Sequence, residues 1–175
     1  HVTLNVPGRH NIANALAAIA FATEAGIDTD TIIRGLQAFG GTARRFEYKG
    51  KLGGITIIDD YAHHPTEIAA TLTAARNYPH GRIICVFQPH TYTRTKAFWN
   101  QFSDALTLAD VVVLADVYAV RETDTLGIHC EDLADDIRRK GTESYYFPSF
   151  DAIENFLLET CTDNDLILTM GAGDI

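Results

Sequence analysis

The chain has 175 residues, a length that fits one ordinary domain or one domain with part of another. Hydrophobic residues make up 46% of it, which is enough for a core. The 14 Lys and Arg against 23 Asp and Glu give a net charge of −9, so nucleic-acid binding through clustered cations is not expected. No apolar run is long enough to span a bilayer, and the chain begins at His1 rather than Met, so further sequence is expected upstream.

The first 42 residues are predicted to be a helical fragment of another domain. Alternating apolar residues predict a short strand over residues 1–7. Ala, Leu and Ile dominate residues 12–25, which predicts a helix, and a second helix is expected over residues 31–39. A Gly-rich stretch follows before any new strand pattern begins, so we expect a domain boundary near residue 42.

Two amide side chains fall near the start of the first predicted helix. Asn11 and Asn14 are three residues apart, so they share one face of that helix. Such a pair offers donors and acceptors to a planar polar group such as adenine. The alternative is that Asn11 caps the helix and Asn14 has no role.

Residues 43–175 alternate between strand and helix patterns. After a short first strand and a Gly-Gly turn, apolar strands alternate with helices, which implies a mostly parallel sheet with helices on both faces. The fold class expected is α/β, with a Rossmann-like sheet of about six strands. The predicted strands are 46–51, 55–58, 82–87, 111–115, 143–147 and 165–170, and the predicted helices are 66–78, 95–108, 130–139 and 150–161.

The segment ITIIDDYAHHPTEI, residues 55–68, carries the densest polar cluster. A buried strand runs directly into Asp59 and Asp60, and His63 and His64 follow before a helix. Carboxylates at the carboxyl end of a parallel strand accept hydrogen bonds from ribose hydroxyls or organise a cation. The alternative is that one Asp caps the helix and His63 is a solvated loop residue.

Polar residues follow three other strands in the same way. These loops are residues 88–94, 116–122 and 171–174, and parallel strands bring them to the same edge of the sheet as residues 59–64. We therefore expect a ligand site at this edge. Just after the domain boundary, Arg44 and Arg45 are either surface cations or a phosphate clamp.

Motifs limit the chemistry of this site. The chain has no G-x-x-x-x-G-K-[ST] phosphate loop and no G-x-S-x-G nucleophile elbow, and its terminal Gly-Ala-Gly-Asp is a weak dinucleotide signal. His63, His64 and His90 do not match a zinc spacing, so no metal bound by this chain alone is expected. The cysteines form no C-x-x-C pair, which favours reduced thiols in a cytosolic protein; they are Cys85, Cys130 and Cys161.

Six ordered segments together resemble the Mur ligase family. They are VPGRHNIANALAAIA, ARRFE, IIDDYAHHPTEI, VFQPHTYTRTK, ADVYAVRE and LILTMGAGDI, and they cover nearly the whole chain. Within this family, the resemblance is greatest to the member that attaches L-alanine to UDP-N-acetylmuramate. It implies that residues 1–42 are the C-terminal tail of a central ATPase domain and that residues 43–175 form the C-terminal Rossmann-like domain.

The resemblance also implies a reaction. ATP phosphorylates the muramoyl carboxylate, and the amine of L-alanine attacks the acyl phosphate to form an amide in peptidoglycan precursor synthesis. Mg²⁺ is required, and its ligands and the phosphate loop are expected in the rest of the same polypeptide, upstream of this chain. The implied partners are ATP, L-alanine and UDP-N-acetylmuramate, the implied location is the cytoplasm, and the chain alone is expected to be inactive.

The matched motifs place two groups of side chains at the substrates. In the nucleotide group, the resemblance puts Asn11 and Asn14 at adenine, Asp60 at the ribose hydroxyls, and Arg45 at ribose or phosphate. The amino-acid group consists of His63, His90 and Arg94, with Arg94 suited to a carboxylate.

Three alternatives remain open from the sequence. One is the related ligase that reattaches a recovered murein tripeptide to the same UDP-sugar. The others are a nicotinamide-dinucleotide-binding dehydrogenase domain and a nucleotide-binding module without catalytic activity.

Overall fold

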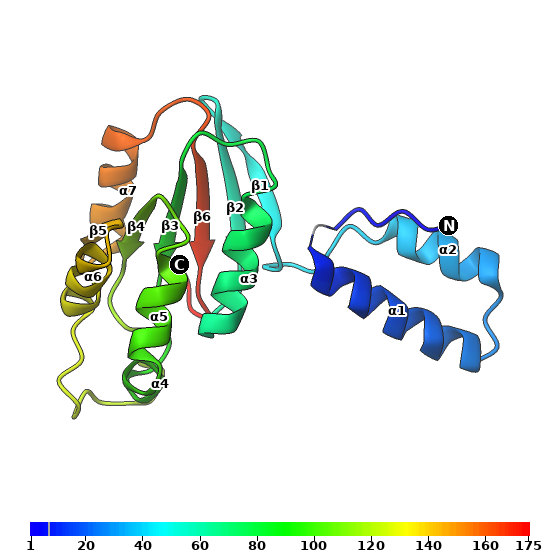
Figure 1. Ribbon diagram of the computed structural model, residues 1–175, viewed down its shortest axis with the longest axis horizontal. Helices are drawn as coiled ribbons and strands as arrows, with labels where there is room; N and C mark the ends of the chain where they lie inside the picture. The colour runs from blue at the N-terminus through cyan, green and yellow to red at the C-terminus, as the bar shows by residue number, and fades with distance from the viewer. Residues whose placement is uncertain (7) are drawn as a thin grey trace. The chain divides into compact units, whose positions relative to one another are not determined.

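The computed structural model describes residues 1–6 and 8–175, including the side chains of all of these except Arg9 and His10. The chain divides into two compact units, His1–Ala43 and Arg44–Ile175, which are described separately here (Figure 1). Within the described residues, no helix has both the length and the apolar character needed to cross a membrane.

The first unit contains two helices, α1 (Arg9–Glu24) and α2 (Thr29–Ala38). Asp28 caps α2 by accepting a hydrogen bond from Thr31 N at 2.9 Å. The strand expected over residues 1–7 is wrong for residues 1–6, which have no strand conformation, while Pro7 lies outside the described residues. A strand needs a neighbouring strand for its main-chain hydrogen bonds, and the described part of this unit supplies helices only.

The second unit is built on a six-stranded sheet with the order β1-β2-β6-β3-β4-β5. β1 pairs antiparallel with β2, and all other neighbours are parallel, so the expectation of a mostly parallel α/β sheet is confirmed. The last strand of the chain is inserted between β2 and β3. The bounds are β1 Glu47–Leu52, β2 Ile55–Asp60, β3 Ile83–Phe87, β4 Val111–Leu114, β5 Glu143–Tyr146 and β6 Leu166–Met170.

Helices cover both faces of this sheet (Figure 1). Side chains of α3 (Pro65–Ala75), α5 (Trp99–Leu106) and α6 (Cys130–Arg139) form one core layer with the strands, and α7 (Phe150–Thr160) packs on the other face. β3 and β4 are buried along their whole length, as expected for central parallel strands. Burial of each large aliphatic side chain contributes about 1.5–3 kcal/mol, so these layers fix the positions of the strand ends.

The single helix expected over residues 95–108 is wrong. Two helices occupy the region, α4 (Tyr92–Ala97) and α5, and they are separated at Phe98, whose φ of −114° and ψ of 22° are not helical. The Phe98 ring packs against the core and lies 4.7 Å from the His64 ring, centroid to centroid. Tertiary packing of one aromatic side chain therefore interrupts a segment whose local pattern is continuously helical.

Candidate functional site at the carboxyl edge of the sheet

The loops after β2, β6, β3 and β4 leave the same edge of the sheet, because these four adjacent strands are parallel. Two of these loops are joined directly. Tyr118 N donates to Pro89 O at 2.8 Å, Thr91 N donates to Tyr118 O at 3.0 Å, and His90 and Tyr118 form a parallel β-bridge. The expected convergence of polar loops at one edge is thus present in the structure.

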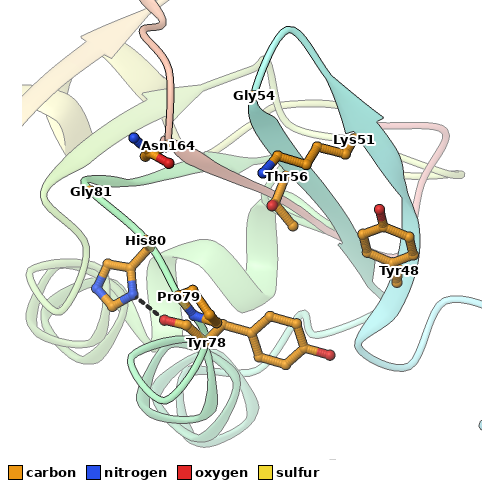
Figure 2. A pocket seen from close by; sticks show the side chains of 9 residues that line it. All are labelled: Tyr48, Lys51, Gly54, Thr56, Tyr78, Pro79, His80, Gly81 and Asn164. Carbon is orange, nitrogen blue, oxygen red and sulfur yellow. Dashed lines mark hydrogen bonds between the residues drawn. The ribbon is translucent and has the colours of Figure 1, made fainter.

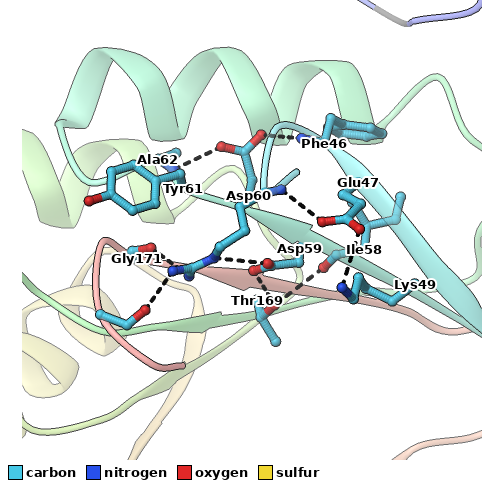
Figure 3. A network of polar contacts seen from close by, with 12 residues as sticks. Phe46, Glu47, Lys49, Ile58, Asp59, Asp60, Tyr61, Ala62, Thr169 and Gly171 are labelled. Atoms are coloured by element: carbon cyan, nitrogen blue, oxygen red, sulfur yellow. Dashed lines mark hydrogen bonds and ion pairs between the residues drawn. The ribbon is translucent and has the colours of Figure 1, made fainter. Parts of the chain in front are cut away.

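Asp59 and Asp60 end β2 and point to opposite faces of the sheet (Figure 3). Asp60 lies on the α3 face, where its two carboxylate oxygens accept hydrogen bonds from Phe46 N at 2.9 Å and Ala62 N at 2.8 Å. It is 6% exposed, and burial raises the pKa of its carboxyl group although these N–H donors oppose the shift. The Thr71 side chain is a third hydrogen-bond partner of this carboxylate.

Asp59 occupies the other face and is held by two partners. It accepts from Thr169 Oγ1 at 2.9 Å and from Arg44 Nε at 3.0 Å. Arg44 also donates to the carbonyl oxygens of Gly171 and Gly173, at 2.8 Å and 2.6 Å. The alternative that Asp59 or Asp60 caps the following helix is therefore wrong.

The residue that caps α3 is His64. Its Nδ1 accepts from Thr66 N at 3.4 Å, and the Glu67 carboxylate accepts from His64 N at 3.3 Å, which together form a capping box. His63 has a different environment: its Nδ1 lies 3.0 Å from Tyr61 O, and its ring centroid is 5.7 Å from that of His90. Of the two adjacent histidines, His64 stabilises the helix and His63 lies next to His90, another member of the predicted amino-acid group.

His90 and Arg94 form a close pair. Arg94 Nη1 lies 3.0 Å from His90 Nδ1, and a guanidinium has no acceptor, so Nδ1 is the acceptor and the neutral ring carries its proton on Nε2. Burial lowers the pKa of His90, and the charges of Arg94 and His63 act in the same direction. A neutral His90 at pH 7 follows, and its Nε2–H has no acceptor among the described residues. The structure thus brings His63, His90 and Arg94 together.

The two adjacent arginines have different surroundings. Arg44 has its guanidinium engaged by three acceptors, whereas Arg45 donates no hydrogen bond among the described residues and lies with Cζ 5.7 Å from the centroid of the Tyr61 ring. Its charge opposes the upward pKa shift of Asp60, so the two groups interact. The roles predicted for them, Asp60 at the ribose hydroxyls and Arg45 at ribose or phosphate, stay predictions.

Asn11 and Asn14 belong to α1 in the first unit. Asn14 Nδ2 donates to Asn11 Oδ1 over 3.4 Å, so the amide pair lies on one helix face as expected. The N-cap of α1 is Gly8, without a side-chain capping hydrogen bond, so the alternative that Asn11 caps this helix is wrong. The amide pair has the donors and acceptors that suit an adenine edge.

A pocket of about 640 Å³ lies at the other edge of the sheet and is not formed by any of the predicted site residues (Figure 2). It is lined by Tyr48, Lys51, Gly54, Thr56, Tyr78, Pro79, His80, Gly81 and Asn164. Ligands of open α/β sheets bind at the carboxyl ends of the strands, so the carboxyl edge remains the candidate site. Within residues 1–6 and 8–175, no group of three or more His, Cys, Asp and Glu side chains is arranged to hold a metal ion.

Sequence reasoning missed the structural roles of two residues at this edge, since Arg44 was predicted only as a surface cation or a phosphate clamp. Tyr118 links two loops and its ring lies 5.8 Å from that of His90, and Arg44 connects β2 to the turn after β6. Tyr118 was recognisable only as part of a polar loop. Nothing in the sequence distinguishes Arg44 from Arg45.

Comparison with known proteins gives consistent results. The family "Mur ligase, glutamate ligase domain" matches residues 44–173. The UDP-N-acetylmuramate–L-alanine ligase of Agathobacter rectalis is 61% identical over 174 residues, covering 99% of this chain and 38% of that protein. The ligase of the same name from Clostridium botulinum is 52% identical, again over 99% of this chain and 38% of that protein. The chain thus spans 38% of the length of these curated relatives.

Solved structures agree with these matches. A UDP-N-acetylmuramate–alanine ligase from Thermotoga maritima superposes with a TM-score of 0.81 and 34% identity, covering 99% of this chain and 36% of that one. A murein peptide ligase from Psychrobacter arcticus gives a TM-score of 0.71 and 28% identity, covering 98% of this chain and 36% of that one.

Proposed function

The chain belongs to the Mur ligase family, and we propose that it is the C-terminal part of an ATP-dependent ligase that joins L-alanine to UDP-N-acetylmuramate through an acyl phosphate. The observation that carries this proposal is the similarity over almost the whole chain to ligases that add L-alanine. The same relationship argues against a nicotinamide-dependent dehydrogenase. We propose that the activity belongs to peptidoglycan precursor synthesis and that the protein acts in the cytoplasm.

We propose that residues 1–42 are the tail of the central ATPase domain and that residues 43–175 are the C-terminal domain. In support, the chain divides into compact units at Ala43 and Arg44, and the family match begins at residue 44. Asn11 and Asn14 contact adenine from the first unit, while Asp60 and Arg45 contact ribose and phosphate from the second.

The amino-acid side of the site is formed by His63, His90 and Arg94. The Arg94 guanidinium binds the carboxylate of L-alanine, because among the described residues its side chain contacts His90 through Nη1 and keeps its other N–H donors for a bidentate contact. Neutral His90 adds a donor at Nε2 without adding a positive charge next to the attacking amine. These groups therefore hold the amino acid by its carboxylate and leave its amine free to react.

ATP and Mg²⁺ depend on residues outside this chain for the phosphate end of the nucleotide. The sequence has no G-x-x-x-x-G-K-[ST] phosphate loop, and the resemblance to the family puts the residues that would hold Mg²⁺ in the upstream part. When bound, Mg²⁺ neutralises charge on the phosphates during transfer. The contribution of this chain is to bind adenine, ribose and the amino acid.

A test uses the complete ligase that contains this chain. We expect ADP formation that requires both UDP-N-acetylmuramate and L-alanine. Turnover with a murein tripeptide but not with L-alanine would instead support the recycling ligase, which is the second candidate because a murein peptide ligase also has this fold. No turnover with either amine would refute a ligase of this substrate class.

The isolated 175-residue chain is expected to catalyse nothing. Its own nucleotide contacts would support only millimolar affinity, or about −4 kcal/mol. Alanine-dependent ATP hydrolysis by the purified chain, or micromolar ATP binding measured by calorimetry, would show that the chain has a phosphate site of its own. Either result would contradict the proposal that the phosphate-binding residues lie outside this chain.

A further inference from the structure

Arg44 makes five hydrogen bonds to other parts of the chain at the carboxyl edge. Its main chain has a φ of 56°, which non-glycine residues seldom adopt. Arg44 N donates to Glu47 Oε2 at 2.7 Å, and Arg44 O accepts from Tyr61 N at 2.6 Å. The main chain of this residue therefore joins the start of β1 to the end of β2.

The guanidinium of Arg44 joins β2 to a third segment, the turn at residues 171–173. Nε donates to Asp59 Oδ2, and the two terminal nitrogens donate to the carbonyl oxygens of Gly171 and Gly173. The Asp59 carboxylate is in turn held by Thr169 Oγ1 of β6, as Figure 3 shows. Three acceptors on two segments match the fixed fork of a guanidinium, and the single ammonium of Lys has no such geometry.

The 171–173 turn lies directly against the loops of the amino-acid group. A Cβ on Gly173 would lie 2.3 Å from Gln88 Oε1 and 3.0 Å from Tyr118 Cγ, and a Cβ on Gly171 would lie 3.0 Å from Gln88 O. Gln88 is 7% exposed, and its Oε1 has no hydrogen-bond partner among the described residues. The turn is therefore packed closely on Gln88 and Tyr118, and a side chain at residue 171 or 173 would require one of these neighbours to move.

Tyr118 contacts both the 171–173 turn and His90. Besides the β-bridge between them, their ring centroids are 5.8 Å apart, and His90 Nδ1 accepts from Arg94 Nη1. A displacement of the turn would release one side of Tyr118 and so change the position of the His90 ring.

We propose that Arg44 is a positioning residue, which fixes the 171–173 turn against Gln88 and Tyr118 and thereby orients the His90–Arg94 pair without contacting a substrate. What that pair binds rests on the proposed function, whereas the positioning itself does not. The adjacent Arg45 has the same charge but makes none of these contacts, so it provides a matched comparison.

The first experiment determines which ring nitrogen of His90 carries the proton in the 175-residue chain, by long-range ¹H–¹⁵N NMR at a pH where the ring is neutral. We expect the Nε2–H tautomer with an unprotonated Nδ1 in the unmodified chain and in Arg45→Ala. Arg44→Ala should give a tautomer mixture, and ethylguanidinium below denaturing concentrations should restore the original signal. Arg44→Lys keeps the charge and the alkyl stem, so it serves if Arg44→Ala does not fold, and it should also lose the single tautomer.

Two results would overturn the proposal. One is an unchanged His90 signal in a folded Arg44 variant. The other is a changed signal in Arg44→Ala that ethylguanidinium does not restore, since this would indicate a general loss of structure rather than loss of one guanidinium.

The second experiment measures kinetics in the complete ligase. Arg44→Ala should raise the KM for L-alanine about 10-fold or more, as for other residues that orient a site residue indirectly, and should leave the KM for ATP within about twofold. Arg139→Ala, whose side chain is 70% exposed on α6, should change neither value. Equal increases in both KM values would contradict positioning. Absence of any alanine-dependent turnover in the unmodified ligase would refute the proposed function, while the NMR experiment would still decide the role of Arg44.

Discussion

Replacing Asp60 by alanine should destabilise the fold of the second unit, even when no ligand is bound. The carboxylate accepts from Phe46 N and Ala62 N, so it joins the segment before β1 to the loop after β2. Each buried N–H left without an acceptor lowers the free energy of unfolding by about 1–3 kcal/mol. Removing a buried charge also removes the cost of burying it, which offsets part of this loss. The net loss is about 2–4 kcal/mol, which lowers the melting temperature of a unit of this size by about 4–16 °C.

Thermal unfolding of the 175-residue chain, followed by circular dichroism at pH 7, tests this value. Glu154→Ala removes an exposed carboxylate on α7 and should change the melting temperature by about 1 °C or less, since most surface substitutions are nearly neutral. A melting temperature of Asp60→Ala equal to that of the Glu154 control would refute the reasoning. In the complete ligase, the KM for ATP should be measured below the new unfolding transition, so that loss of a ribose contact is separated from loss of fold.

Three further predictions concern other residues. Arg94→Lys should raise the KM for L-alanine about 10- to 100-fold in the complete ligase and leave that for UDP-N-acetylmuramate unchanged, because a point charge does not replace a bidentate guanidinium; equal increases would indicate a structural role. Burial alone would raise the pKa of Asp165, but Arg82 and main-chain donors hold it below its ordinary value, so the ionised carboxylate stabilises the fold above about pH 4 and this stabilisation is lost as the pH falls through the lowered pKa. Asp165→Asn should therefore weaken the fall of the melting temperature at acidic pH, and an unchanged fall would contradict this. Gly171→Ala should cost about 1–3 kcal/mol in urea unfolding because a main-chain oxygen would lie 3.0 Å from the new Cβ and φ is 153°, whereas Gly81→Ala, with neighbours at 3.5 Å or more, should be nearly neutral, and equal losses would count against the steric argument.

The sequence by itself determined the order of the elements in the second unit. Apolar runs such as Ile83–Phe87 have the period and length of buried strands, and local signals begin and end helices such as Cys130–Arg139, so the sheet was predictable. Polar residues after successive strands also predicted which edge carries the site, since parallel strands place their carboxyl ends together. These features are local in the chain, and for that reason composition and spacing reveal them.

Only the tertiary structure decided which partners each of two neighbouring residues contacts. Asp59 and Asp60 are chemically identical, but the pleat of β2 points them to opposite faces, where one meets Arg44 and the other meets main-chain donors. The break at Phe98 depends on packing against a ring more than thirty residues earlier in the chain, a contact that no local pattern contains. Insertion of the last strand between β2 and β3 brings the 171–173 turn to Arg44, because pairing between strands depends on long-range contacts and not on their order in the sequence.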